Sequence, residues 1–181
     1  MKGTAPRAPN AEEDLANKRA LENSEKDRSE NIMIVDMIRN DLGRICQPGT
    51  ITADNLFAIE SLPTVWQQTS SVSGKTEARF SDILSTLFPC ASITGAPKKR
   101  TMEIINALED DARGIYTGCI GVLKPDRSMR FSVAIRTLVL DTDTRSASYG
   151  IGGGIVWDSA PLSEWQESLD KSRLLNGVSP A

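Results

Sequence analysis

The sequence contains no histidine, and this absence removes several kinds of catalytic and metal site. Ser–His–Asp triads and Cys–His dyads need an imidazole, and so do the many zinc sites that use histidine ligands. Any chemistry must therefore use lysine, carboxylates, hydroxyls, backbone amides or a hard metal ion. The three cysteines (Cys46, Cys90 and Cys119) are odd in number and widely spaced, so we expect no disulfide framework and a reducing, cytoplasmic location.

The sequence also lacks a long apolar run, a signal-peptide pattern and any strongly basic segment. We therefore expect no membrane span, no secretory leader and no nucleic-acid-binding surface. The 181 residues, of which 39% are hydrophobic and 25% charged, carry a net charge of −3 and are typical of one globular domain.

Hydrophobic periodicity and turn residues predict an α+β chain with mainly antiparallel strands and packed helices. After an extended or irregular lead-in over residues 1–10, a long helix is expected over residues 12–42, with Ile32, Val35, Ile38 and Leu42 on its buried stripe. Strands are expected over 51–61, 64–73, 114–123, 129–140 and 147–149. Helices are expected over 80–87, 97–109 and 162–176, and residues 89–95 are expected to form a loop.

Charged residues recur at helical spacing in the last predicted helix. Glu164, Glu167 and Lys171 occupy positions i, i+3 and i+7, which places them on one stripe. Two carboxylates on one stripe can hold a hard divalent cation such as Mg²⁺, with the lysine near enough to bind an anion. A solvated helix face with an i, i+4 Glu–Lys ion pair explains the same pattern.

Two further segments each allow a ligand-binding interpretation and a purely structural one. Asp27 and Glu30 repeat the i, i+3 spacing on the long helix, either as ordinary surface charge or as further ligands of the same Mg²⁺. Ser92 and Thr94 precede the start of a basic helix, where free N–H groups favour an anion. Simple capping by Thr94 is the alternative.

The glycine-rich segment 150–154 could approach a ligand closely and donate backbone amides. It does not complete the pattern G-x-G-x-x-G, so nucleotide binding has little support, and a tight bend is the alternative. Arg136 and Tyr116 offer a planar guanidinium and a hydroxyl to a pocket. They could equally be a surface charge and a core aromatic.

Together these segments resemble the chorismate-utilising enzymes, a family that includes anthranilate, aminodeoxychorismate, isochorismate and salicylate synthases. The resemblance runs in family order over nearly the whole chain. It covers residues 30–31, 34–36, 39–41, 92–98, 116–121, 135–137 and 152–154 and the helix of Glu164, Glu167 and Lys171. It implies the C-terminal portion of the anthranilate synthase-like α+β fold, with residues 1–181 as a chorismate-binding domain that is incomplete at its N-terminus.

The resemblance also implies a magnesium site. Glu30 and Glu167 are expected to bind Mg²⁺ directly, with Glu164 and Asp27 in or near the shell through water. Lys171 is expected to support this site, and the metal to hold the ring carboxylate of chorismate. The acidic side chains of the first and last helices are thus expected to meet around one ion.

For the substrate, the resemblance implies that Arg136, Tyr116 and the amide of Gly154 hold the enolpyruvyl carboxylate of chorismate. Ser92 and Thr94 are expected to contact the substrate as well.

Lys2 distinguishes subgroups within the family. Residues 2–7 (KGTAPR) resemble the motif in which aminodeoxychorismate synthases carry a nucleophilic lysine, whereas anthranilate synthases have alanine there. The resemblance implies that the amine attacks C2 of chorismate with loss of the C4 hydroxyl. Ammonia from a glutamine amidotransferase partner then adds at C4, giving 4-amino-4-deoxychorismate for the route to 4-aminobenzoate and folate. A solvated lysine is the alternative interpretation.

The chain also departs from the family pattern. Met1 stands before Lys2 where Pro-Ile is usual, Gln67 stands where many relatives have histidine, and family members are more than twice as long. We therefore expect little or no turnover from this chain alone. The alternatives are a catalytically incomplete fragment or an anthranilate or isochorismate synthase-type relative.

Overall fold

The computed structural model describes residues 1–157 and 159–172, and the chain divides into two compact units, Met1–Ala91 and Ser92–Ala181. Every strand pairing in the described residues is antiparallel, and helices occur in both units, which confirms the predicted α+β class. All three cysteines are free. None of the helices in the described part of the chain has the length and apolar character that crossing a membrane requires.

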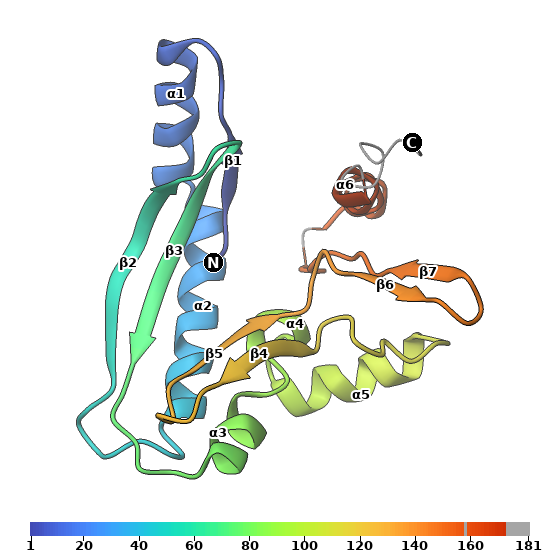
Figure 1. Ribbon diagram of the computed structural model, residues 1–181. Coiled ribbons are helices and arrows are strands. Elements are labelled where there is room, and N and C mark those ends of the chain that lie inside the picture. Colours follow the sequence, from blue (N-terminus) through green and yellow to red (C-terminus); the bar gives the residue numbers. More distant parts are fainter. Residues whose placement is uncertain (158, 173–181) are drawn as a thin grey trace. The chain divides into compact units, whose positions relative to one another are not determined.

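The first unit is a three-stranded sheet with helices alongside it (Figure 1). The sheet order is β1–β3–β2, and α2 packs against β3 and β2. Its elements are β1 (Thr4–Pro6), α1 (Ala11–Glu22), α2 (Glu25–Leu42), β2 (Thr52–Ser61), β3 (Val65–Ser73) and α3 (Phe80–Leu87). The lead-in predicted to be extended or irregular over residues 1–10 thus contains a short edge strand.

The single helix predicted over residues 12–42 is wrong, because two helices occupy this segment. α1 ends at Glu22, and Ser24 has the extended dihedral angles φ −69° and ψ 105°. The Ser24 hydroxyl accepts a hydrogen bond from the Asp27 amide at 3.2 Å, which satisfies one of the free N–H groups in the first turn of α2. The break therefore has a local cause in the side chain of Ser24.

The buried face of α2 is also offset from the predicted stripe. Ile34 and Val35 are buried, and so is Asn31, whereas Ile32 is 38% exposed. Asn31 is satisfied by β3, because the Ser70 hydroxyl donates a hydrogen bond of 2.6 Å to its Oδ1. The contact between helix and sheet is therefore partly polar where hydrophobic periodicity predicts an apolar stripe.

The second unit carries two β-hairpins and the last helix. Its hairpins are β4 (Cys119–Leu123) with β5 (Met129–Val133), and β6 (Leu138–Asp141) with β7 (Ser146–Tyr149). The helices are α4 (Ala91–Thr94, within the predicted loop), α5 (Lys98–Leu108) and α6 (Pro161–Ser172). The predicted end of the last helix, residues 173–176, lies outside the described residues.

Candidate functional site

Lys2 and Glu30 form an ion pair within the first unit. The Nζ atom of Lys2 lies 3.1 Å from Oε2 of Glu30, and the two side chains are 30% and 23% exposed. Lys2 immediately precedes the Gly3 turn into β1, and Glu30 lies on α2. The predicted nucleophile therefore sits beside a carboxylate that was predicted to bind metal.

Gly3 determines how closely the chain before β1 approaches α2. Its φ is +83°, in the region that favours glycine, and a Cβ at this position would lie 2.9 Å from the Cβ of Asp27. Asp27 lies one helical turn before Glu30 on α2. The Gly3 turn therefore brings Lys2 to the part of α2 that carries both predicted acidic residues.

In the second unit, Tyr116 lies along the glycine-rich segment. A Cβ on Gly150 would overlap the Tyr116 ring, and a Cβ on Gly152 would lie 3.0 Å from its hydroxyl oxygen. Glycine thus permits a close approach of backbone to ring. Burial is the main cause that raises the pKa of Tyr116 above 10, with Arg113 opposing it and Glu109 adding to it, so the hydroxyl stays protonated and can donate a hydrogen bond at neutral pH.

The same backbone connection positions Tyr116 and Arg136. Thr117 donates its amide to the Ala134 carbonyl at 2.8 Å, and Ala134 donates its own amide to the Gly118 carbonyl at 2.9 Å. Ala134 is buried, and Arg136 follows it two residues later with a φ of +50°. Arg136 is thus held at a sharp bend that leaves its guanidinium exposed.

Helix α6 contacts the glycine-rich segment through charged side chains. Lys171 donates hydrogen bonds to the Gly152 carbonyl at 2.9 Å and to Oε1 of Glu167 at 2.6 Å. A Cβ on Gly153 would lie 3.1 Å from Oε2 of Glu164. The three predicted residues of α6 therefore lie on one stripe, and two of them face the glycines directly.

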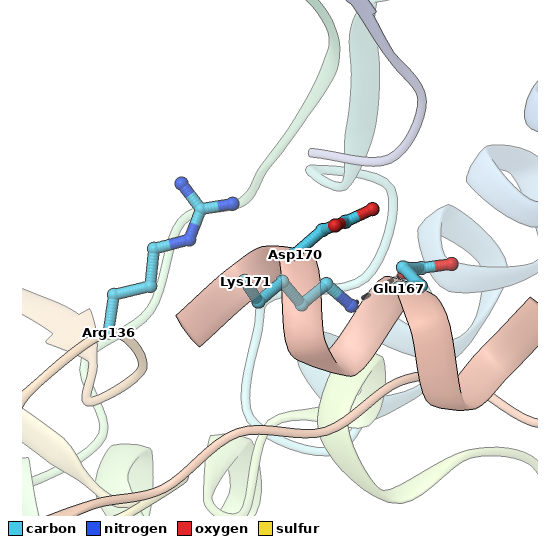
Figure 2. A pocket seen from close by; sticks show the side chains of 4 residues that line it. All are labelled: Arg136, Glu167, Asp170 and Lys171. Carbon is cyan, nitrogen blue, oxygen red and sulfur yellow. Dashed lines mark hydrogen bonds and ion pairs between the residues drawn. The ribbon is translucent and has the colours of Figure 1, made fainter. Parts of the chain in front are cut away.

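An open pocket of about 340 Å³ lies between Arg136 and α6 (Figure 2). Its lining residues are Arg136, Glu167, Asp170 and Lys171. Figure 2 shows the ammonium of Lys171 turned toward Glu167, with Arg136 across the pocket. The two cations suit a carboxylate ligand, and the acids suit a hydroxyl group or a cation.

Three predicted substrate-binding residues lie outside this pocket. Ser92 and Thr94 lie on α4, are half-buried and do not line this pocket. Gly154 follows the glycines that Tyr116 and α6 contact, and it is exposed. The predicted substrate contacts of these three residues stay predictions.

The acidic side chains suit a hard cation by their chemistry. Glu164 and Glu167 present carboxylate oxygens one helical turn apart, and Mg²⁺ commonly binds one or two carboxylates while it keeps several waters. Within neither unit do three acidic or cysteine side chains of the described residues gather into a larger ligand group. Glu30 belongs to the first unit, so its sharing of one ion with the α6 pair stays a prediction.

Asp170 lines the pocket but is absent from the residues that the sequence singled out. It follows Glu167 by three positions, so the helical spacing that selected Glu164 and Glu167 continues to Asp170. Gln166 donates a hydrogen bond of 3.1 Å to Oδ1 of Asp170. The i, i+3 spacing of Glu164 and Glu167, continued by one step, identifies this residue.

Comparisons with known proteins identify the family. Residues 1–177 match the family model described as chorismate binding enzyme. The chain is 44% identical over 180 residues to aminodeoxychorismate synthase component 1 of Klebsiella aerogenes, covering 97% of this chain and 39% of that protein. It is 40% identical over 175 residues to anthranilate synthase component 1 of Saccharolobus solfataricus, covering 96% and 41%.

A solved structure shows the same fold. The crystal structure of anthranilate synthase component I from Streptococcus pneumoniae TIGR4 matches with a TM-score of 0.83 and 34% identity, over 95% of this chain and 41% of that one. The chain thus spans about two-fifths of the length of these relatives.

Proposed function

The chain belongs to the family of chorismate binding enzymes, and from this membership we propose that it carries catalytic residues of an aminodeoxychorismate synthase. The reaction converts chorismate and ammonia to 4-amino-4-deoxychorismate, which leads toward 4-aminobenzoate and folate. A glutamine amidotransferase partner supplies the ammonia, and the cytoplasm is the proposed location. The single observation that carries the proposal is the Lys2 amine held 3.1 Å from Glu30.

In the proposed reaction the Lys2 ammonium first loses one proton to solvent, and the neutral amine then forms a bond to C2 of chorismate. Both ring double bonds shift, the C4–O bond breaks, and the hydroxyl leaves as water with the proton that the attacking nitrogen gives up. Ammonia then bonds to C4 and the C2–N bond to Lys2 breaks, which restores the free amine. Glu30 orients the amine before attack, because its carboxylate is the hydrogen-bond acceptor of Nζ.

Residues of the second unit supply the proposed substrate contacts, and two of them, Arg136 and Lys171, line its pocket. Arg136 and Lys171 bind carboxylate oxygens of chorismate, and the protonated Tyr116 hydroxyl donates to the enolpyruvyl carboxylate beside the amide of Gly154. Ser92 and Thr94 complete the contacts. Glu30, Glu164 and Glu167 are the proposed Mg²⁺ ligands, and the ion, when bound, neutralises the ring carboxylate.

A trapping experiment tests the role of Lys2. Incubation of the full-length parent protein with Mg²⁺ and chorismate, without ammonia, should add chorismate less one water to the peptide that contains Lys2, as measured by mass spectrometry. Addition of an ammonium salt should release 4-amino-4-deoxychorismate. Lys2→Ala should abolish the adduct, whereas Lys18→Ala on α1 should retain it. An adduct on another residue, or none on the parent chain, contradicts the proposal.

Anthranilate synthesis is the second candidate, because anthranilate synthase relatives are 40–41% identical to this chain. The two activities differ in product. Anthranilate formation by the parent chain at a rate unchanged in Lys2→Ala would favour this candidate.

A further inference from the structure

The Gly3 carbonyl accepts two hydrogen bonds from β3. The Gln68 main-chain amide donates one at 3.0 Å, and the side-chain amide of Gln67 donates the other at 2.7 Å. A carbonyl oxygen has two lone pairs, so both acceptor positions of Gly3 are used. The side-chain bond adds to the regular β1–β3 pairing.

The orientation of the Gln67 amide follows from its neighbours. Thr4 donates its hydroxyl to Oε1 of Gln67 at 3.2 Å, while Nε2 faces the Gly3 carbonyl. Rotation of the amide by 180° would set its oxygen against the Gly3 oxygen, and neither atom has a proton to donate. The surroundings therefore select the orientation in which Gln67 binds Gly3.

Gly3 in turn controls the position of Lys2. Main-chain pairing with β3 ends at Lys2, whose amide donates to the Gln68 carbonyl at 3.1 Å. Residues at the start of an edge strand fray readily unless another contact holds them. Gly3 has a φ of +83° and lies close to Asp27. A change in the orientation of the Gly3 peptide would therefore turn the Lys2 side chain away from Glu30.

We propose that Gln67 is a positioning residue, whose side-chain amide holds the Gly3 carbonyl and thereby directs the Lys2 amine toward Glu30. The catalytic meaning of this role rests on the proposed function of Lys2. The geometric effect does not, because it concerns only residues of the first unit. Gln67 touches neither Lys2 nor Glu30 through its side-chain hydrogen bonds. Its Nε2 also donates a longer hydrogen bond of 3.3 Å to the Gln68 carbonyl, which accepts from the Lys2 amide, so Gln67 acts through the main chain and chiefly through Gly3.

Zero-length carbodiimide cross-linking of the 181-residue chain measures the Lys2–Glu30 contact directly, because it joins only an amine and a carboxyl that already touch. Gln67→Met should lower the yield of the Lys2–Glu30 amide about three- to tenfold, the factor expected for one lost hydrogen bond. The Lys18–Glu22 pair, at 3.4 Å on α1, is the internal standard and should keep its yield.

Thr69→Ala is the matched control variant. It removes the hydrogen bond of 2.8 Å from β3 to Glu60 and leaves the Gly3 carbonyl untouched, so the Lys2–Glu30 yield should not change. An unchanged yield in Gln67→Met, or an equal loss in Thr69→Ala, overturns the proposal. The experiment needs no chorismate, so its failure is distinguishable from failure of the trapping experiment.

A measurement on the parent chain serves if Gln67→Met does not fold. One proton of the Gln67 side-chain amide should exchange with solvent about tenfold more slowly than those of the exposed Gln47 amide, as expected for a stable hydrogen bond. Equal exchange rates in NMR spectra would overturn the assignment of Gln67 to Gly3.

Discussion

Lys2 and Glu30 lie 28 residues apart in the chain, yet their charged groups are 3.1 Å apart. The same carboxylate is the counter-ion of the proposed nucleophile and a proposed ligand of Mg²⁺. A cation that binds Glu30 must therefore share this carboxylate with the Lys2 ammonium. The two predicted roles of Glu30 are coupled through its position on α2.

Removal of the Lys2 charge should tighten magnesium binding. Lys2→Met leaves Glu30 without a competing cation, and a partly exposed ion pair contributes about 0.5–1 kcal/mol, so the Mg²⁺ affinity should rise about two- to fivefold. Isothermal titration of the chain with MgCl₂ measures the change. Lys18→Met should leave the affinity unchanged, and an unchanged affinity in Lys2→Met would argue against Glu30 as a ligand.

Gly3→Ala should destabilise the first unit by about 1–3 kcal/mol, because the new Cβ meets Asp27 and the residue must keep a positive φ. Urea unfolding measures this change. Gly49→Ala is the matched control, since Gly49 has a φ of +76° and open space around its Cβ position. Gly49→Ala therefore destabilises the fold only through its backbone conformation. An equal decrease in the free energy of unfolding in both variants would show that the approach of Gly3 to Asp27 is unimportant.

The sequence predicts two strands and one short helix of the first unit well. The strands expected over residues 51–61 and 64–73 occur as β2 and β3 within one residue of these limits, and α3 matches its predicted range. Proline or glycine bounds the two strands at residues 48–49, 63 and 74, and α3 has apolar residues at helical spacing. Their structure is therefore encoded locally.

Two of the differences come from tertiary contacts. β1 is a strand only because β3 pairs with it, and proline is tolerated there at a sheet edge. Asn31 occupies the buried face of α2 because Ser70 on β3 satisfies its amide. A single sequence does not show that β3 pairs with β1 or that Ser70 lies beside Asn31. The hydrophobic period of the helix alone therefore predicts that Ile32 is buried.

The candidate site likewise has one part that the sequence predicts and one part that depends on tertiary contacts. The spacing of Glu164, Glu167 and Lys171 predicts their common stripe, because α-helical geometry alone determines it. The Lys2–Glu30 contact depends on the Gly3 bend and on β3, and no spacing rule contains these elements. Its functional meaning came only from resemblance to a family.

Substitution of Gln68 by an apolar residue should stabilise the first unit. Its side chain is fully buried, and neither amide atom has a hydrogen-bond partner among the described residues. Gln68→Met removes both unsatisfied polar atoms at similar volume and should stabilise the unit by about 1–3 kcal/mol in urea unfolding. Gln67→Met makes the same substitution at an amide that is hydrogen-bonded, and it should destabilise the unit.

Lys171→Met should weaken chorismate binding in the second unit. The variant removes one of the two cations of the pocket and the hydrogen bond to the Gly152 carbonyl. One hydrogen bond to a charged group contributes roughly 1.5–3 kcal/mol, so the dissociation constant should rise at least tenfold. Lys124→Met, in the β4–β5 turn, is the control for net charge. Equal effects of both variants in calorimetric titration would indicate long-range charge alone.

The pH dependence of stability should report the contact of Asp14 with Arg7. Arg7 Nε donates to Oδ1 of Asp14 at 2.8 Å, and its guanidinium lies 4.3 Å from the centre of the Trp66 ring. The Arg7 hydrogen bond is the main cause that lowers the pKa of Asp14 to about 2, and the Ala8 amide and the Trp66 indole add to it against burial.

A carboxyl group whose pKa is lower in the folded state stabilises the fold fully above its unfolded pKa, near 4. For Asp14 this contribution should be lost as the pH falls from about 4 through about 2. The difference in unfolding free energy between the parent and Asp14→Asn should therefore be constant above pH 5 and shrink toward pH 2 in urea titrations. Arg7→Met removes the main cause and should flatten the same part of the profile. A difference that stays constant down to pH 2 would show that Arg7 does not stabilise the ionised Asp14.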